Sequence, residues 1–482
     1  MPVEALKSLL PYGGWTADHA ATVTFTGQGD PVLPTPFRIA TAGAATLAAT
    51  GLAASDLWET RTGRRQTIGV DLRQAAASLR SGHYLKIGDG ELSAARNSIM
   101  GTYPTKDGRW SYVHANFPNH RAAALKVLGC AETPEAVAKA VLTWNALDLE
   151  EAILEAKGAG GMVRSAAEWA QHPQSAAIAA LPLMEIIRIG DSDPEPLPPG
   201  DHQGGHQGDH QGDRQGDRPL SGIRVVDITR VLAGPTCART LAEHGAEVMK
   251  ITAPHLPNLG YQEADTGHGK LSAHLDLRKA EDLATLKTLI KDADVFSQGY
   301  RPGTLASRGL SPEELAKLRP GLVYVSLCAF SHAGPWASRR GFDTVVQTVS
   351  GMTLRQTEVV PGKKPGPAFY PVSAIDYCTG YLMATGAMLA LNRRAQQGGS
   401  WLVRISLAQV GKWIVDLGEV PGDAARAAPA EFTPEEIKSW SMVSDTPQGK
   451  LTHLAPVLKL SETKPYWARP SVPLGYHPAA WP

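Results

Sequence analysis

The sequence predicts an α/β protein built on a parallel, doubly wound sheet with Rossmann-like connections. After residue 219, short apolar segments alternate with segments of helical character. Ile223–Ile228 (IRVVDI) reads as a buried strand and Glu247–Ile251 (EVMKI) as the next strand, and Gly234–His244 between them reads as a helix with Pro235 near its first turn. Strands that alternate with helices in this way form a parallel sheet covered on both faces.

The following segments continue the alternation. Further strands are expected at Leu271–Leu277, Asp294–Phe296 and Leu322–Cys328, and further helices at Lys279–Lys291 and Ser311–Leu318. Ser311 precedes the last of these helices, with Glu314 three residues later. This is the pattern of a capping box, in which each side chain bonds the other's backbone N–H.

The first half of the chain has a different pattern. Thr46–Leu57 reads as an Ala-rich helix, and Gln66–Ala77 reads as a strand that runs into a helix. Gly101–Phe117 predicts a β-hairpin, because Asp107-Gly108 is a turn signal between alternating aromatic and β-branched residues. Short helices are expected at Arg121–Leu128, Thr133–Ala140 and Leu149–Lys157.

A repeated polar segment, 201–218 (DHQGGHQGDHQGDRQGDR), separates the halves. It has no apolar residue, so we expect a solvated linker. His202, His206 and His210 are four residues apart; they could bind a metal weakly, but we expect them to be incidental to the repeat. The chain then divides into 1–200, the linker 201–218, 219–420 and 421–482. The last part is rich in Pro and Trp, and we expect it to lie extended over the surface.

Composition excludes several classes of protein. The 482 residues are 43% hydrophobic, and 47 Lys and Arg balance 47 Asp and Glu, which argues against a nucleic-acid binder. Four distant cysteines without a CxxC pair favour neither a disulfide framework nor a zinc site. Apolar runs stop short of the roughly 18 residues of a membrane span, and the first residues lack the core of a signal peptide. We therefore expect a cytoplasmic protein with no membrane partner and no metal.

An internal repeat links the two halves. Residues 36–74 align without a gap on residues 371–409, and both copies read as helix, polar turn, strand and helix. The identical positions include Ala49-Thr50-Gly51 with Ala384-Thr385-Gly386. We favour a true duplication. Thr41 then falls opposite Asp376, so divergence of the copies would leave one active site.

Two loops could bind phosphate groups. The loop after the first strand has only Gly234, so neither a dinucleotide-binding GxGxxG nor a Walker motif is present. It could still present backbone N–H groups to a phosphate, or be a plain turn. Arg339 and Arg340 could pair with phosphates. Asp343 beside them could belong to a site, or cap the helix Thr344–Val349.

Asp376 is the third candidate. It lies in the apolar stretch 369–380, at the start of a helix that reaches Leu391. Apolar surroundings raise the pKa of a carboxyl, whereas a helix N-terminus favours its anion. Such a carboxylate could attack an activated acyl group, or simply cap the helix. No GxSxG or HExxH motif offers another catalytic centre.

The stretch Leu220–Asp376 resembles the class III CoA-transferases, the family of formyl-CoA and carnitine CoA-transferases and of 2-methylacyl-CoA racemases. The matching segments are LSGIRVVDITRVLAGPTCARTLAEHGAEVMKI, HLDLRKAEDLATLKTLIKDADVFSQGYRPG, RGLSPEELAKLRPGLVYVSLCAFSHAGP, GFDTVVQTVSG and AIDYCTG. In the first half, Pro36–Ala77 resembles the segment around the family's catalytic Asp, and Ser81–Trp169 resembles its small α+β domain, which we place at 81–190.

The resemblance implies two fused, incomplete copies. Protomers of the family interlock as a dimer, so the halves are expected to form an intramolecular pseudo-dimer, with a homodimer also possible. Asp376 takes the place of the catalytic aspartate. The expected CoA contacts are Val231, Leu232 and Ala233 in the first loop, Arg301 in the GYRPG turn, and Arg339 and Arg340. The substrates would be an acyl-CoA and a carboxylic acid.

Departures from the family pattern separate three functions. Racemases carry a His where this chain has Phe342, which argues against two-sided proton transfer. Thr252 replaces an acidic residue and Gly299 an Asn, and the glycine-rich loop of formyl-type members is absent. The leading hypothesis is a CoA-transferase with Asp376 as nucleophile. The alternatives are a non-catalytic acyl-CoA-binding homologue and, third, a racemase.

Overall fold

The structure is a computed structural model that describes residues 1–88, 90–92, 96–197, 217–362 and 366–482. His202, His206, His210 and most of the expected linker lie outside the described residues. No helix within the described ranges is long and apolar enough to cross a membrane. The same ranges contain no group of three or more His, Cys, Asp and Glu side chains that could hold a metal ion.

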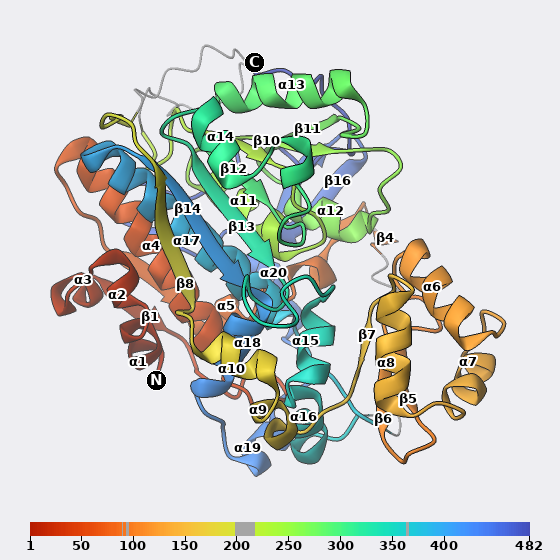
Figure 1. Cartoon of the computed structure of the whole chain (residues 1–482). Coiled ribbons are helices and arrows are strands. Elements are labelled where there is room, and N and C mark those ends of the chain that lie inside the picture. The colour runs from red at the N-terminus through yellow and green to blue at the C-terminus, as the bar shows by residue number, and fades with distance from the viewer. Residues whose placement is uncertain (89, 93–95, 198–216, 363–365) are drawn as a thin grey trace.

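A seven-stranded sheet forms the centre of the larger body (Figure 1). Its strand order is β11-β10-β9-β12-β13-β14-β8, and every pair is parallel except β14 with β8. The strands are β8 (Met184–Gly190), β9 (Arg224–Asp227), β10 (Glu247–Thr252), β11 (Lys270–His274), β12 (Val295–Gln298), β13 (Val323–Cys328) and β14 (Ser400–Ser406). The predicted α/β fold with a largely parallel sheet is confirmed.

Helices cover both faces of this sheet. Val225 of β9 belongs to the apolar core that includes α11 (Ala233–Glu243) and α17 (Ala374–Gln397). The next residue, Val226, belongs to the core that includes α13 (Ala280–Lys291) and α14 (Pro312–Leu318). Because successive strand residues point to opposite faces, both faces need apolar side chains, which explains why apolar residues such as Val225 and Val226 follow one another.

The seventh strand corrects the expected end of the small domain. We placed 81–190 in that domain, but β8 leaves it and pairs with β14, with Arg188 opposite Trp401 and Met184 opposite Ile405. Helices α9 (Ala166–Ala170) and α10 (Pro173–Ala179) precede β8. Without β8, strand β14 would be an open edge with unpaired backbone groups, and a strand of the first half covers it.

Two long helices join the halves at the positions of the internal repeat. Helix α4 (Ile39–Thr62) packs against α17, and both have 24 residues. The hydroxyls of the equivalent residues Thr50 and Thr385 are 3.1 Å apart. After each helix comes a strand and a second helix, β2 (Ile68–Asp71) with α5 (Leu72–Ser78), and β14 with α18 (Leu407–Asp416). The repeated sequence thus forms the same elements twice, packed around matching threonines.

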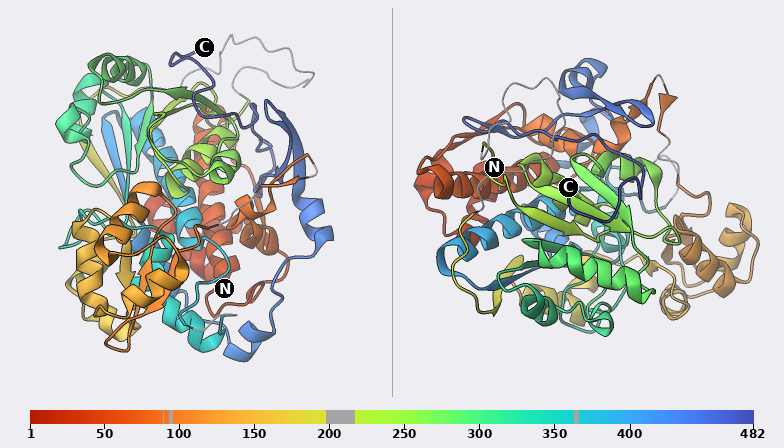
Figure 2. Two further views of the ribbon diagram at one scale, coloured as in Figure 1. Left: turned by 90° about the vertical axis from the view of Figure 1, so that its right-hand side faces the viewer. Right: turned by 90° about the horizontal axis from the view of Figure 1, so that it is seen from above.

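A small unit with its own apolar core projects from one side of the larger body (Figures 1 and 2). It contains β5 (Gly101–Pro104), β6 (Trp110–Val113), β7 (Gly160–Met162), α6 (Pro118–Leu128), α7 (Pro134–Val141) and α8 (Ala146–Glu155). The expected hairpin is present: β5 and β6 pair antiparallel, and Gly108 in their turn has a φ of 74°. Glycine adopts this left-handed conformation without the steric cost of a side chain.

The C-terminal segment is not extended throughout, in contrast to our expectation. It forms α19 (Gly422–Ala427), α20 (Pro434–Trp440), a hairpin of β15 (Ser441–Thr446) and β16 (Gly449–Leu454), and β17 (Lys459–Leu460). Strand β17 pairs with β2 of the first half. Beyond it the chain does run extended, and the indole N–H of Trp467 bonds the Arg239 carbonyl of α11 at 3.1 Å. This segment therefore contacts both halves.

The remaining elements are short. They are α1 (Pro2–Lys7), α2 (Leu10–Gly13), α3 (Ala17–Ala21), β1 (Val23–Thr26), η1 (Ser81–Tyr84), β3 (Lys86–Ile87), β4 (Gly90–Glu91), α12 (Gly260–Thr266), η2 (Ala306–Arg308), α15 (Asp343–Val349) and α16 (Met352–Val359).

Candidate active site

Asp376 lies in the first turn of α17 and faces a small pocket between the halves. It is only 8% exposed. The pocket, of about 70 Å³, is called the Asp376 pocket below. Its walls come from the first half (Arg96, Met100, His114, Asn116, Phe117) and from the second (Val231, Leu232, Leu259, Tyr261, Gln262, Phe342, Asp343, Thr344, Ser373). Both halves are thus needed to build it.

A second carboxylate, Asp343, holds the start of α17. One of its oxygens accepts the backbone N–H of Asp376 at 3.1 Å, and the other accepts the Gln347 amide at 2.5 Å. Asp343 therefore caps α17, and not the helix that it begins itself. Burial raises the pKa of Asp343 to about 6. Burial and the neighbouring Asp343 raise the pKa of Asp376 well above its usual value.

The first copy has a similar helix cap but lacks a carboxylate at the position of Asp376. The Asp30 carboxylate accepts the backbone N–H groups of Ala40 and Thr41 at 2.8 and 2.9 Å. Thr41 is the residue that the repeat aligns with Asp376. Asp30 thus caps α4 as Asp343 caps α17, but a threonine stands in place of the second carboxylate. The two duplicated helices thus carry a carboxylate at this position only once.

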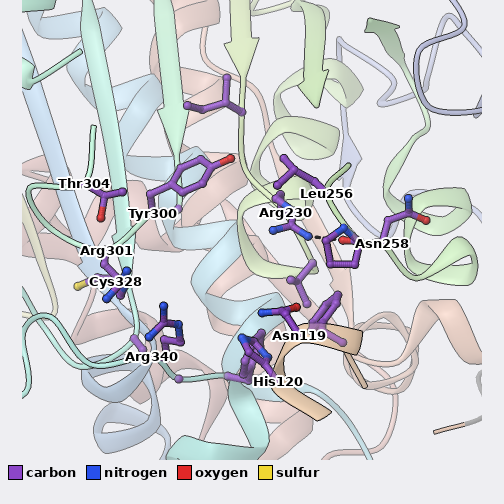
Figure 3. Close-up of a pocket in the computed structure, with 18 of the residues that line it drawn as sticks. Asn119, His120, Arg230, Leu256, Asn258, Tyr300, Arg301, Thr304, Cys328 and Arg340 are labelled. Carbon is purple, nitrogen blue, oxygen red and sulfur yellow. Dashed lines mark hydrogen bonds between the residues drawn. The ribbon is translucent and has the colours of Figure 1, made fainter. Parts of the chain in front are cut away.

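A large cleft opens at the carboxyl ends of β9, β12 and β13 (Figure 3). Its volume is about 790 Å³. The sheet order reverses between β9 and β12, and ligands of such sheets bind at this switch point. We call it the arginine cleft. Its lining includes Asn119 and His120 of the small unit, Arg230 after β9, Tyr300 and Arg301 after β12, and Arg340.

The arginines of the cleft differ in what they already contact. Figure 3 shows Arg301 and Arg340 on one side of the cleft and Arg230 on the other. Among the described residues, Arg340 has no ion pair or hydrogen bond. Burial and the nearby Arg301 lower its pKa, so an anion placed between them would be stabilised. Arg230 was not among the CoA contacts expected from the sequence. The only sequence signal for it was its position next to Val231, which was expected to contact CoA.

Arg339 contacts protein carboxylates. Its guanidinium is 3.1 Å from Glu150 and 2.8 Å from Glu151, both on α8, and lies 3.9 Å from the centre of the Trp336 ring. Its charge is therefore balanced without a phosphate. Although Arg339 is part of the cleft wall, it joins the small unit to the segment before α15.

The three expected loop residues lie at different depths. Val231 lines both the arginine cleft and the Asp376 pocket, and its φ of 72° is unusual for a β-branched residue. Leu232 lines the Asp376 pocket, and Ala233 is a buried first residue of α11. Backbone strain of this kind costs about 1–3 kcal/mol and clusters at functional sites. Of the three residues, Val231 is the one that lines the arginine cleft, and it is also the one with the unusual backbone conformation.

The arginine cleft and the Asp376 pocket share Phe117, Val231 and Phe342 as wall residues. Phe342 lies flat on the His114 ring, with 4.1 Å between ring centres and an angle of 4°. Burial lowers the pKa of His114 to about 3, so this imidazole is neutral at physiological pH. A ligand with phosphates at the arginines could therefore extend past Val231 towards Asp376.

The sequence model of CoA-transferase family III matches residues 12–193 and 220–418. The chain belongs to CoA-transferase family III. The two matched segments lie on either side of the expected linker, as two fused incomplete family copies would.

Several curated relatives are similar to the chain. An acetyl-coenzyme A transferase of Hypoxylon pulicicidum is 32% identical over 67% of this chain and 55% of the relative. A probable fatty acyl-CoA transferase of Mycobacterium tuberculosis is 30% identical over 44% of this chain and 58% of its own length. A succinyl-CoA–L-malate CoA-transferase beta subunit of Chloroflexus aurantiacus is 34% identical over 37% and 47%. The matches thus span about half the length of these relatives.

Solved structures give shorter matches. A CaiB/BaiF family protein from Brucella suis is 29% identical, covers 40% of this chain and 54% of its own, and has a TM-score of 0.36. A Mycobacterium tuberculosis protein of known structure is 31% identical over 42% and 57%, also with a TM-score of 0.36.

Proposed function

We propose that the chain is a CoA-transferase that moves CoA from an acyl-CoA to a carboxylic acid, with Asp376 as the nucleophile. The observation that carries the proposal is the position of Asp376, buried at the start of α17 in a pocket that continues into the arginine cleft. The phosphates of CoA would lie at Arg301, Arg340 and Arg230. Packing of α4 on α17 supports an intramolecular pseudo-dimer that completes the site.

The reaction would proceed by four exchanges at carbonyl carbons. The Asp376 carboxylate attacks the donor thioester, and the C–S bond breaks to give an acyl-aspartyl anhydride and CoA thiolate. The thiolate attacks the Asp376 carbonyl, which releases the donor acid and leaves an aspartyl-CoA thioester. The acceptor carboxylate attacks that thioester, and the thiolate then attacks the acceptor carbonyl, which restores Asp376. A covalent nucleophile replaces one difficult transfer by easier steps.

Two alternatives have weaker support. A non-catalytic acyl-CoA-binding homologue would also have the arginine cleft, but it would not need a buried carboxylate at its inner end. A racemase would need a second proton-transferring group, and Phe342 occupies the position where racemases of the family have a His. His114 stacks on Phe342 but is held neutral by burial.

The test is a mass spectrum of the protein after incubation with a panel of acyl-CoAs, before and after hydroxylamine. We expect a CoA-sized or acyl-sized adduct on the peptide that contains Asp376, and its removal by hydroxylamine. Failure of every donor to give an adduct, with measurable CoA binding, would favour the non-catalytic homologue. Exchange of an α-proton for deuterium without an acceptor acid would favour the racemase.

Replacing Arg340 with Gln should weaken CoA binding about tenfold or more, because charge-assisted contacts to phosphate contribute about 1.5–3 kcal/mol. The measurement is CoA titration by calorimetry. Arg121→Gln is the control, since Arg121 pairs with Glu132 and does not line the cleft. Equal affinities of Arg340→Gln and the control would contradict the phosphate assignment.

Replacing Asp343 with Asn should move the acid limb of adduct formation to lower pH. Adduct formation needs ionised Asp376, whose raised pKa makes the rate fall as pH falls. The substituted side chain carries no charge to raise this pKa, and its amide can donate to the Gln347 side-chain oxygen, which has no partner among the described residues. The measurement is the adduct-formation rate as a function of pH, between about pH 5 and 9. An unchanged profile would show that the Asp343 charge does not act on Asp376.

A further inference from the structure

A second large cavity adjoins the Asp376 pocket on another side from the arginine cleft. Its volume is about 810 Å³. It shares Arg96, Leu232, Tyr261, Gln262 and Ser373 with the Asp376 pocket, and no wall residue with the arginine cleft. We call it the tyrosine pocket. Asp376 therefore lies between two cavities, one of which the proposed function assigns to CoA.

Segments from both halves enclose the tyrosine pocket. Its walls are Arg80, Gly82, His83, Leu92 and Arg96 of the first half, and Leu232, Tyr261, Gln262, Asp265, Phe369, Tyr370, Pro371, Val372, Ser373 and Tyr377 of the second. The aromatic rings supply broad apolar surfaces. Asp265 does not contribute a free charge, because Arg239 is 3.0 Å away and the Tyr377 hydroxyl donates to it at 2.9 Å.

Two polar groups of this wall lack partners. Tyr370 is 4% exposed, and its hydroxyl, which lies beside the Ile375 backbone N–H, donates to no group in the described part of the chain. The side-chain oxygen of Gln262 likewise accepts no hydrogen bond there. The nearby Asp343 and Asp376 help burial to raise the pKa of Tyr370 well above its usual value, which keeps its hydroxyl a donor beside the carboxylates. A buried hydroxyl without a partner is costly unless a ligand completes it.

Of the two arginines in the wall of the tyrosine pocket, one is paired with a carboxylate and the other is not. Arg80 is paired with Glu431 at 3.1 Å. Arg96 has no ion pair with any described residue, and it lines both the tyrosine pocket and the Asp376 pocket. The end of the tyrosine pocket nearest Asp376 thus offers a free guanidinium and a free hydroxyl, which together suit one carboxylate.

We propose that the tyrosine pocket binds the acceptor acid, whose carboxylate is held beside Asp376 by Arg96 and the Tyr370 hydroxyl, and that this acid is a bulky monocarboxylate with a ring-bearing body. The inference rests on the proposed transferase function. Pockets of about 300–1,000 Å³ suit drug-sized molecules, so an acid of two to four carbons would leave most of this one empty. One free guanidinium can pair with one carboxylate, and the aromatic walls can pack against an apolar body.

This arrangement separates the two substrates. CoA would stay in the arginine cleft during the whole cycle, while the donor acid leaves the tyrosine pocket and the acceptor acid takes its place. The acceptor carboxylate oxygen would attack the Asp376 thioester carbonyl from the tyrosine pocket, and the C–S bond would break towards the cleft. Because the thiolate remains close, it can attack the new anhydride and regenerate the Asp376 carboxylate.

Binding of 2-naphthoate to the full chain, measured by calorimetry with and without saturating CoA, tests the proposal. We expect naphthoate to bind in both conditions, and succinate at least tenfold more weakly. Arg96→Gln and Tyr370→Phe should each weaken naphthoate binding about tenfold, and Leu92→Trp should block it by filling the pocket. Arg121→Gln is the control for Arg96→Gln, because Arg121 does not line the pocket. Tyr476→Phe is the control for Tyr370→Phe, because Tyr476 is 55% exposed and does not line the pocket.

Displacement of naphthoate by CoA, equal binding in all variants, or tighter binding of succinate would each overturn the proposal. The readout does not depend on chemistry, so its failure is distinguishable from failure of the proposed function. An Asp376 adduct with unaltered naphthoate binding in the pocket variants would retain the transferase and reject the tyrosine pocket as its acceptor site. Naphthoate binding that the pocket variants weaken, without any adduct on Asp376, would retain the pocket as an acid-binding site and reject the transferase.

Discussion

Replacing Asp376 with Asn should abolish adduct formation and lower transferase turnover by about 10⁴-fold or more, as expected when a covalent nucleophile is removed. The amide is close in size to the carboxyl, and the contact of the Asp376 backbone N–H with Asp343 does not involve the side chain. We therefore expect the fold and CoA binding to persist. The measurements are the mass of the intact protein after donor incubation and the rate of acyl-CoA formation.

Two further variants make this result specific. Asp376→Ala excludes slow conversion of the Asn back to Asp. Asp416→Asn removes an exposed carboxylate on α18 that pairs with Lys412, and it should react like the unmodified chain. Wild-type turnover in Asp376→Ala would exclude covalent catalysis by this residue.

Replacing Lys270 with Met should destabilise the protein by about 3–5 kcal/mol, because it leaves a buried charge without its partner. Lys270 is 1% exposed and its ammonium donates to Asp227 at 3.1 Å and to the Pro235 carbonyl at 2.8 Å. Asp227 in turn accepts the backbone N–H of Thr229 at 2.9 Å. The ion pair thus holds the loop that leads to Val231, and thermal unfolding would measure its contribution.

A double-mutant cycle separates the charge from the packing. In Asp227→Asn combined with Lys270→Met, no uncompensated charge remains, and Asn can still accept from Thr229. We expect the double variant to be more stable than Lys270→Met alone. If the stability lost in the double variant equals the sum of the losses in the two single variants, the two residues do not act as a pair.

Much of the larger body could be predicted from sequence. Strands of the main sheet such as β9 and β13 carry apolar residues on both faces because both faces are covered, and the capping box at Ser311 forms as expected. The repeat of 36–74 in 371–409 placed Thr41 and Asp376 at matching positions of two helices. The family assignment also followed from local motifs, and the family match confirmed it. These features depend on residues that are close together in the sequence, so they can be predicted without the tertiary structure.

The partners of charged groups could be decided only by the tertiary structure. Asp343 caps α17 because packing brings the start of α15 to the start of α17, whereas the sequence offered only a site residue or a cap of its own helix. Arg339 meets Glu150 and Glu151 of the small unit, whereas Arg340 beside it has no ion pair among the described residues. Neighbours in sequence thus acquired opposite roles, because an ion pair depends on distances across the fold.

The sequence by itself determined the α/β fold, the family and the nucleophile candidate, because periodicity and motifs act over short separations. Only the tertiary structure decided that β8 closes the main sheet and that Arg80 and Arg96 line one pocket with Tyr370. Such cavities form where distant segments pack imperfectly against one another. Their walls and free polar groups are set by that packing, which no single segment encodes.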